Sequence, residues 1–405
     1  MPSGDGLILR FALPPAGIHA TQVRALQRLA CDHGSGLIEI TRRGKLQLRG
    51  VQERGLLSLQ RELQRLGLAA DSALVVNPLA GLLRDYPALD ALAAAISGAL
   101  AASGAQDSLS GKFGVVLDCG GMLRDIAADV RVEVNDPLGE LATVSVPAAE
   151  GGAWLELGTC RAEACPQAVA ELALELAELT RSSRMALSRM RDLVRTRGHA
   201  SLESRFAPHA CSARRAPEGA SPQSWIGFHV GRQSWFGVGA PFGVAEAASW
   251  LTLAEIAERY GSGWLRLSPF RGAVLPGIAQ EHVAEVIELT RAAGWILDER
   301  DPLLRAVACP GAPACSCGLG ATRAIARALL PLLSPTQTLH VSGCAKSCAS
   351  DTPASITLVC DPEGARLATD ATAFEAATQP PQELSAIREH CRELAQSSPA
   401  RTTRA

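Results

Sequence analysis

Four cysteines in two short clusters carry the clearest chemistry in this chain. Cys309 and Cys315 lie in CPGAPAC, and Cys344 and Cys348 lie in HVSGCAKSC. Thiolates are soft ligands, and four of them on two loops suit an iron–sulfur cluster or a tetrahedral zinc ion. Paired zinc ligands usually have about two to four residues between them, fewer than the first cluster has. The spacing therefore favours a cluster of iron and sulfide over zinc.

The residues around these cysteines fit loops that hold such a group. Pro310, Gly311 and Pro313 bend the first loop sharply, and Gly343 lets the backbone come close just before Cys344. Backbone amides at such a position can donate to cluster sulfurs. We expect the two loops to meet.

Two details of the ligand set are predicted from spacing. Cys344 and Cys348 are four residues apart, so one turn of helix would place both thiols on one face. Cys317 lies two residues beyond Cys315 and is a rival ligand. The alternative is that all of these are ordinary buried thiols of a reduced protein.

Composition indicates an ordinary globular protein of several domains. The 405 residues are 47% hydrophobic and 20% charged, with a net charge of −2. A nucleic-acid-binding protein would show a strong basic excess. No apolar run reaches about 18 residues without a charge, and the start of the chain does not resemble a signal peptide. We therefore expect a cytoplasmic protein with no nucleic-acid or membrane partner and with reduced cysteines.

Hydrophobic periodicity predicts a β-α-β-β-α unit at the start of the chain. A strand is expected over 6–13, a helix capped by Thr21, two strands joined by a turn near Gly44, and a helix over 53–66. Residues 34–51 align without a gap on residues 261–278, with five identities, so the same unit returns later. Two halves related by a pseudo-twofold axis are predicted.

Each half is followed by a longer α/β segment. The first includes GKFGVVLDCGG and a helical stretch over about 168–197. The second carries the cysteines, with a helix over 319–330 and a strand between the two cysteine pairs. Residues 207–224, rich in Pro, Ser, Ala and Arg, read as a linker.

The cysteine motif and this order of segments resemble the nitrite and sulfite reductase family from about residue 5 to 395. The resemblance implies an α+β fold with two ferredoxin-like half-modules, 1–68 and 225–295, and two α/β reductase-type domains, 69–206 and 296–396. The second domain would hold a [4Fe-4S] cluster on Cys309, Cys315, Cys344 and Cys348. Residues 397–405 are expected to form a disordered tail.

The reductases also bind siroheme, whose carboxylates are held by basic side chains. Arg42 matches the arginine of their TTRQ-like motif and Lys112 a lysine of their LPRKFK-like motif, and Cys348 would bridge cluster and siroheme. Other positions of the second motif differ, since Ser110, Gly111 and Gly114 replace a proline, an arginine and a lysine. These losses weaken the siroheme assignment.

Enough basic residues remain to bind a polyanion. Strand alternation places Arg43, Lys45 and Arg49 on one face, and Arg42, Lys112 and Arg271 are further candidates. Only three of the 39 basic residues are lysines, Lys45, Lys112 and Lys346, and each falls in a motif, which indicates a need for a compact ammonium there. The alternative is a charged, solvated edge strand.

The variant HVSGCAKSCA, with Lys346 inside it, resembles the precorrin-3B synthases within this family. That resemblance implies oxygen-dependent hydroxylation of precorrin-3A at C20 with γ-lactone formation, and a mononuclear non-haem iron whose ligands we cannot name from the sequence. His340 lies beside the cysteines, but a lone histidine there is more often a core or hydrogen-bonding residue.

No dinucleotide fingerprint is present, because GVGAPFG has the wrong spacing, so NAD(P)H would act through a separate reductase. Two alternatives stay open. One is a siroheme-dependent sulfite or nitrite reductase, and the other is a non-catalytic iron–sulfur protein that binds tetrapyrroles.

Overall fold

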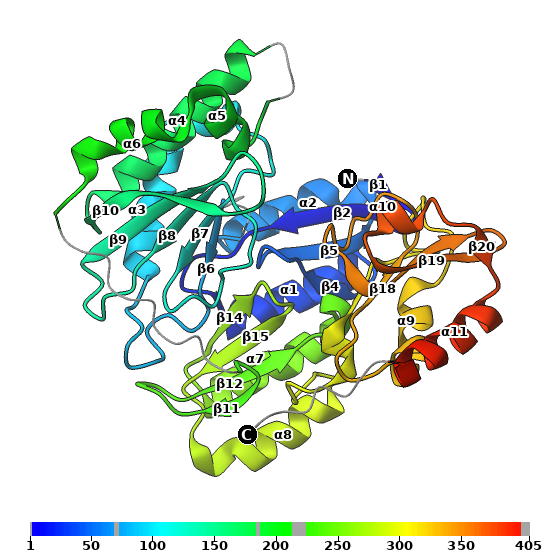
Figure 1. Ribbon diagram of the computed structural model, residues 1–405. Coiled ribbons are helices and arrows are strands. Elements are labelled where there is room, and N and C mark those ends of the chain that lie inside the picture. The colour runs from blue at the N-terminus through cyan, green and yellow to red at the C-terminus, as the bar shows by residue number, and fades with distance from the viewer. Residues whose placement is uncertain (1, 69–72, 184–186, 213–223, 398–405) are drawn as a thin grey trace.

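The computed structural model describes residues 2–68, 73–183, 187–212 and 224–397 (Figure 1). They form four five-stranded sheets, two in ferredoxin-like half-modules and two in α/β units. In Figure 1 the first α/β unit lies at the upper left and the second at the right, with the half-modules between and below them. The predicted α+β class is confirmed.

The first half-module has the predicted order of elements. It contains β1 (Pro2–Ser3), β2 (Gly6–Phe11), β3 (Ile18–His19), α1 (Ala20–His33), β4 (Leu37–Ile40), β5 (Leu46–Val51) and α2 (Glu53–Arg65). The predicted cap is wrong, because His19, not Thr21, caps α1. The His19 ring accepts from the Thr21 amide at 3.3 Å, and the Gln22 side chain accepts from the His19 amide at 2.8 Å, which completes a capping box.

The second half-module repeats this order, with β11 (Gly227–His229), β12 (Trp235–Gly239), β13 (Val244–Glu246), α7 (Ala247–Tyr260), β14 (Trp264–Ser268), β15 (Gly272–Pro276) and α8 (Val283–Ala292). The ungapped alignment extends to backbone conformation. Gly44 has φ 61° and its counterpart Arg271 has φ 66°, although only glycine adopts this region at little cost. The amides of Gly36 and Gly263 likewise donate to Ala30 and Ala257, which are also aligned.

The two half-modules exchange strands. β3 of the first half pairs with β14 of the second, and β13 of the second pairs with β4 of the first. The sheet orders are therefore β1-β2-β5-β4-β13 and β11-β12-β15-β14-β3. Helices α1 and α7 pack against each other, and side chains of both halves, among them Leu26, Leu48, Trp250 and Leu275, form one hydrophobic core. The halves are related as the pseudo-twofold arrangement predicts.

The first α/β unit has sheet order β10-β9-β8-β7-β6, in which β6, β7 and β8 are parallel. Its strands are β6 (Leu74–Val76), β7 (Val115–Asp118), β8 (Val130–Glu133), β9 (Leu141–Pro147) and β10 (Trp154–Arg161), and its helices are α3 (Asp90–Ala102), α4 (Cys165–Ser182), α5 (Met190–Arg197) and α6 (His199–Phe206).

The single helix predicted over 168–197 is wrong, since α4 ends at Ser182 and α5 starts at Met190. Arg189 is extended because the Asp192 carboxylate accepts from its amide and its guanidinium pairs with buried Asp129 at 2.9 Å. Arg184, expected on that helix, lies outside the described residues.

The second α/β unit has sheet order β16-β17-β18-β19-β20, again with its first three strands parallel. Its elements are β16 (Ala306–Ala308), α9 (Thr322–Leu329), β17 (Leu339–Ser342), β18 (Ala354–Asp361), β19 (Gly364–Ala371), α10 (Ala373–Ala376), β20 (Pro381–Gln382) and α11 (Leu384–Ser397). The predicted helix and strand between the cysteine pairs are present, and the helix starts three residues later than expected.

Most of the predicted linker (213–223) and nearly all of the predicted tail (398–405) lie outside the described residues. The domain boundaries themselves stay predictions. Within the described part of the chain, every helix is too short or too polar to cross a membrane.

Candidate functional site

The four predicted ligands lie where the first two parallel strands of the second α/β unit end. Cys309 directly follows β16, and Cys315 lies further along the same loop. Cys344 is two residues beyond β17, and Cys348 is in the turn after it. Because β16 and β17 are parallel neighbours, their carboxyl ends lie at the same edge of the sheet and bring the two loops together.

Glycines allow the two loops to touch. A Cβ on Gly343 of the second loop would lie 3.1 Å from the Gly318 Cα and 3.3 Å from the Gly311 Cα of the first loop. The Leu319 amide donates to the Gly343 carbonyl at 2.9 Å. The Gly343 amide points at the Cys309 Sγ at 3.1 Å. Larger residues at these glycines would force the cysteine loops apart.

The thiols share one electrostatic environment. Burial raises the pKa of the Cys348 thiol, and the nearby thiols of Cys344, Cys309 and Cys315 raise it further. Burial is also the main cause of the raised pKa of Cys360, about 11, with further contributions from Cys309 and Cys344. The other three predicted ligands therefore lie close enough to Cys348 to disfavour ionisation of its thiol. Binding of positively charged iron would reverse that effect.

The donor set fits a cluster better than a single ion. Among the described residues, no three His, Cys, Asp or Glu side chains converge tightly enough to hold one metal ion. Four thiols around a cluster lie further apart than four ligands around a single ion, because each binds a different iron. A set of four neighbouring cysteines with an amide directed at one sulfur suits that arrangement.

The expected helical turn between Cys344 and Cys348 is wrong. The segment is a turn in which Ser347 has φ 53°, and the Ser347 hydroxyl donates to the Ser350 carbonyl. Ser342 also donates to the Cys344 carbonyl at 2.7 Å, which keeps that carbonyl out of a helical bond.

Lys346 contacts the rival thiol Cys317. Its ammonium lies 3.3 Å from the Cys317 Sγ, and both side chains are exposed. The hydrogen bond with Lys346 lowers the pKa of Cys317, and the same bond raises the pKa of Lys346. Lys346 was predicted to bind substrate. Here it lies at the cysteine loops, and a contact with substrate stays a prediction.

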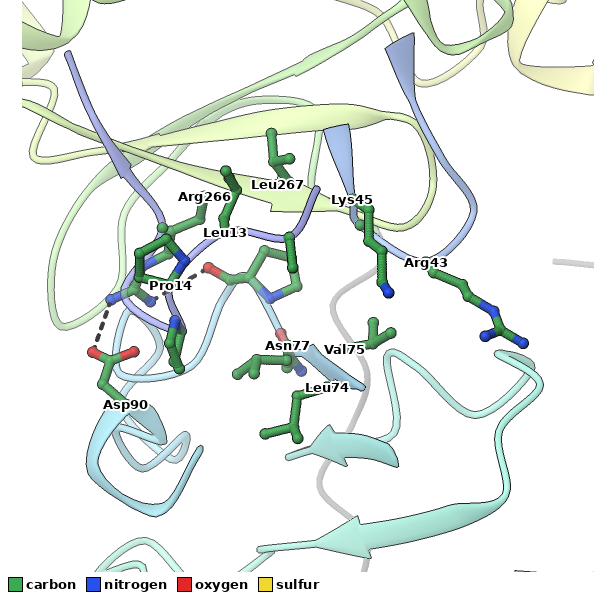
Figure 2. Close-up of a pocket in the computed structure, with 16 residues that line it drawn as sticks. Leu13, Pro14, Arg43, Lys45, Leu74, Val75, Asn77, Asp90, Arg266 and Leu267 are labelled. Carbon is green, nitrogen blue, oxygen red and sulfur yellow. Dashed lines mark hydrogen bonds and ion pairs between the residues drawn. The ribbon is translucent and has the colours of Figure 1, made fainter. Parts of the chain in front are cut away.

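A small recess of about 60 Å³ lies where the two half-modules meet the first α/β unit, and its volume is below that of typical small-molecule sites. Its lining includes Arg43, Lys45, Arg266 and the edge strand β6. Figure 2 shows Lys45 directed towards β6 and Arg266 on the opposite side of the recess, paired with Asp90 at 3.7 Å. None of the four predicted cluster ligands lines this recess.

The Thr41–Lys45 turn joins this recess to the cysteine loops. A Cβ on Gly114 would lie 3.9 Å from the Arg43 Nη1, so Arg43 reaches the loop that carries exposed Lys112. Arg42 points the other way and pairs with Asp351, three residues beyond Cys348, at 3.2 Å. The predicted basic residues thus flank one turn.

Arg49 has a different role from its neighbours. It is 2% exposed, and its guanidinium bonds the Asp5 carboxylate at 3.0 Å and 3.1 Å, the Ser3 hydroxyl at 2.9 Å and the Ala314 carbonyl at 2.6 Å. These bonds occupy Nε and Nη2, Nη1 lies 3.7 Å from the Glu39 carboxylate, and the bond to Ala314 holds the loop just before Cys315. We therefore remove Arg49 from the proposed substrate contacts and assign it to positioning this loop.

Sequence reasoning missed a pair of aligned charges that join the half-modules to the α/β units. Glu39 accepts from Arg323 of α9 at 2.6 Å, and its repeat counterpart Arg266 donates to the Ala80 carbonyl of the first α/β unit at 2.5 Å. Opposite charges at equivalent positions of the repeat, within otherwise apolar strands, were the available signal.

Arg271, at the turn equivalent to Gly44, donates to the Ala349 carbonyl at 3.2 Å. Burial, together with the neighbouring Arg42 and Arg323, lowers its pKa to about 10. Several cations are therefore gathered beside the second cysteine pair.

Comparison with known proteins agrees with this architecture. The family model described as the nitrite/sulfite reductase ferredoxin-like half domain matches residues 1–66 and 229–293. The chain carries this half domain twice. The solved structure of Mycobacterium tuberculosis NirA has the same fold, with a TM-score of 0.72 at 18% identity over 97% of this chain and 82% of that chain.

Two proteins of known type are similar to the chain in sequence. A precorrin-3B synthase from Sinorhizobium sp is 29% identical over 378 residues, which are 90% of this chain and 79% of that protein. The chloroplastic ferredoxin–nitrite reductase of Zea mays is 29% identical over 158 residues, 35% of this chain and 28% of that enzyme. The predicted resemblance to precorrin-3B synthase is confirmed.

Proposed function

We propose that this protein is a precorrin-3B synthase, an oxidoreductase that hydroxylates precorrin-3A at C20 with O₂ and forms a γ-lactone from an acetate side chain. The observation that carries the proposal is the similarity to a precorrin-3B synthase over 90% of the chain.

In this proposal Cys309, Cys315, Cys344 and Cys348 hold a [4Fe-4S] cluster, which supplies electrons one at a time when bound. The contact between Gly343 and Cys309 favours the thiolate form, because an amide hydrogen bond stabilises negative charge on sulfur. Arg49 fixes the first loop through the Ala314 carbonyl. Electrons would come from a separate NAD(P)H-dependent reductase, and a mononuclear non-haem iron is part of the proposal without assigned ligands.

The basic side chains around the Thr41–Lys45 turn would bind and orient the acid-bearing ring. Arg43 and Lys45 line the recess, Lys112 is on the loop that Arg43 reaches, and Arg42 lies on the side of the cysteines. Charge-assisted hydrogen bonds from these groups to acetate and propionate arms would fix which edge of the ring faces the cluster.

The test is turnover by protein purified without oxygen. Absorption and electron paramagnetic resonance spectra would establish the cluster, and precorrin-3A with O₂ and an electron donor would then be supplied. We expect a product heavier by one oxygen atom that contains a lactone. Siroheme in the purified protein together with reduction of sulfite or nitrite would instead identify a reductase, which the similarity to the maize enzyme keeps as the second candidate. Ring binding without turnover would identify a non-catalytic protein.

A further inference from the structure

His340 is a buried histidine that the cluster and the recess leave unexplained. It lies in the middle of β17, four residues before Cys344, and is 1% exposed. Leu339 and Val341 on either side of it pack into the hydrophobic core of the second α/β unit. Since side chains alternate along a strand, the imidazole lies on the other face of the sheet.

Neither ring nitrogen of His340 has a hydrogen-bond partner among the described residues. Leaving a buried polar group unpaired is unfavourable, and native proteins rarely do so without a reason. A ligand group, or a bound water, is the usual explanation. The imidazole is therefore the second observation, beside the cluster of arginines, that points to something bound here.

The charges around His340 decide what kind of group it would meet. Burial, together with the neighbouring Arg271 and Arg42, lowers its pKa to about 4, so the ring is neutral with one N–H donor. The same two cations repel a metal ion and attract an anion. Arg271 is held in place by the Ala349 carbonyl and Arg42 by Asp351, both just beyond Cys348.

We propose that His340, Arg42 and Arg271 form a subsite for one carboxylate of the macrocycle, with the imidazole N–H donating to it. The inference rests on the proposed function, because it assumes that an acid-bearing ring binds beside the cysteine loops. His340 would then be a specificity residue for one carboxylate arm of the ring. That arm would lie on the side of the Thr41–Lys45 turn that faces the cysteine loops.

The test compares the intact protein with His340→Leu and His340→Gln. Leucine fits the buried space without a donor, and glutamine keeps an N–H. Binding of precorrin-3A would be measured without oxygen by absorption titration, with iron content measured alongside. We expect roughly tenfold weaker binding for His340→Leu and a loss of no more than about threefold for His340→Gln, with iron unchanged in both.

Stability separates this role from a structural one. Removing an unpaired buried polar group should leave the unfolding midpoint of His340→Leu equal to or above that of the wild type. A lower midpoint with unchanged ring binding would show that His340 supports the fold only, and the inference would be wrong.

Other outcomes separate the inference from the proposed function. If the wild type binds and hydroxylates precorrin-3A and His340→Leu does so equally well, only the inference fails. If the wild type does not bind precorrin-3A, the proposed function fails and the inference with it. If His340→Leu weakens sulfite or nitrite binding but not ring binding, the subsite takes a small oxyanion, and the carboxylate assignment is overturned.

Discussion

The loops that follow the first parallel strand of the two α/β units occupy equivalent places but differ in chemistry. Asn77 follows β6 and Cys309 follows β16, and each is followed by a proline. The backbone amide of Asn77 donates to the Leu117 carbonyl, and the backbone amide of Cys309 donates to the Val341 carbonyl. Leu117 and Val341 are the third residues of β7 and β17. The two loops therefore start from the same backbone geometry.

Each loop also meets a hairpin from the opposite half-module. A Cβ on Gly4 of the first half would lie 2.4 Å from the Pro313 carbonyl oxygen, and one on its counterpart Gly231 would lie 2.4 Å from the Leu82 carbonyl oxygen. The first half-module thus packs on the cysteine loop of the second α/β unit, and the second half-module packs on the loop of the first unit.

The two loops differ in whether their polar side chains form hydrogen bonds within the loop. The side-chain amide nitrogen of Asn77 donates to the Asp118 carboxylate and to the Cys119 carbonyl, both at 2.8 Å. The side-chain oxygen of Asn77 accepts from the backbone amide of Leu79. Asp118 also accepts from the Leu123 amide at 2.8 Å. At the equivalent edge of the second unit, thiols converge instead. The loop of the first α/β unit is held by hydrogen bonds among its own residues, whereas the equivalent loop of the second unit carries thiols.

The largest predicted effect is on iron. Cys344→Ser should lose essentially all cluster iron, because an alcohol is a poor ligand for iron in a cluster. The matched control is Cys119→Ala in the loop after β7, which should keep full iron content because that loop is closed by its own hydrogen bonds. Iron analysis and electron paramagnetic resonance would measure both. A full four-iron signal in Cys344→Ser would contradict the ligand assignment.

The next effect concerns the hairpin packed on the cysteine loop. Arg49→Met should lower the free energy of unfolding by about 3 kcal/mol, because it leaves the half-buried Asp5 carboxylate without its partner and cuts the bond to Ala314. Denaturant unfolding would measure the loss, and iron content should fall as the first loop loosens. The control Arg24→Met, which breaks an exposed pair with Glu258, should cost under about 1 kcal/mol. Equal costs would remove the special role of Arg49.

The next prediction concerns how the stability of the loop after β7 depends on pH. Burial raises the pKa of Asp118 to about 6, against 3.8 for a free side chain, although the Leu123 amide and Asn77 oppose the shift. Because the folded pKa is the higher one, this carboxyl stabilises the fold fully below about pH 4, and the stabilisation, up to about 3 kcal/mol, is lost as pH rises through about 6.

Carboxyl carbon chemical shifts would report the titration of Asp118 directly. Asp361, at the end of β18 in the second unit, is the matched control. The Glu363 amide and Arg366 lower its pKa, so it should titrate below the usual range. An ordinary midpoint for Asp118 would show that its loop is open to water.

The smallest predicted effect concerns ring binding. Lys112→Ala should weaken precorrin-3A binding by about fivefold, or about 1 kcal/mol, because Lys112 is an exposed charge on the loop that Arg43 reaches. Thr336 precedes β17 by three residues, as Lys112 precedes β7, and Thr336→Ala should have no effect. Absorption titration would measure both, with iron content unchanged. Unchanged affinity in Lys112→Ala would place the basic site elsewhere.

Sequence periodicity predicted the half-modules well because each strand and helix has one apolar face and because the repeat is ungapped. It did not predict the strand exchange. β3 and β13 are short, and their pairing depends on contacts between residues more than 200 positions apart. Spacing rules also failed at Cys344, where the turn is decided by Ser342 and Ser347 rather than by helical propensity.

At the site, residue types and spacing predicted that the two cysteine loops meet, because soft ligands in paired clusters are rare in other contexts. Their role as cluster ligands stays a prediction. The roles of the arginines could not be read in the same way. Strand alternation predicted one face for Arg43 and Arg49. Arg43 instead lies in the Thr41–Lys45 turn and lines the recess, whereas Arg49 lies in β5 and is tied to Asp5. The acceptor that an arginine bonds depends on which segment of the chain folds against it. For Arg49 these acceptors are on Asp5 and Ala314, which are far from Arg49 in sequence.

The strand exchange has a consequence for how the protein is made. The outer partner of β4 is Val244–Glu246, so the first sheet cannot be completed until the ribosome has synthesised the whole of the first α/β unit. Until then, β4 has a free edge that could pair with another nascent chain. Fragments cut between the halves should therefore be recovered only when both are produced in the same cell.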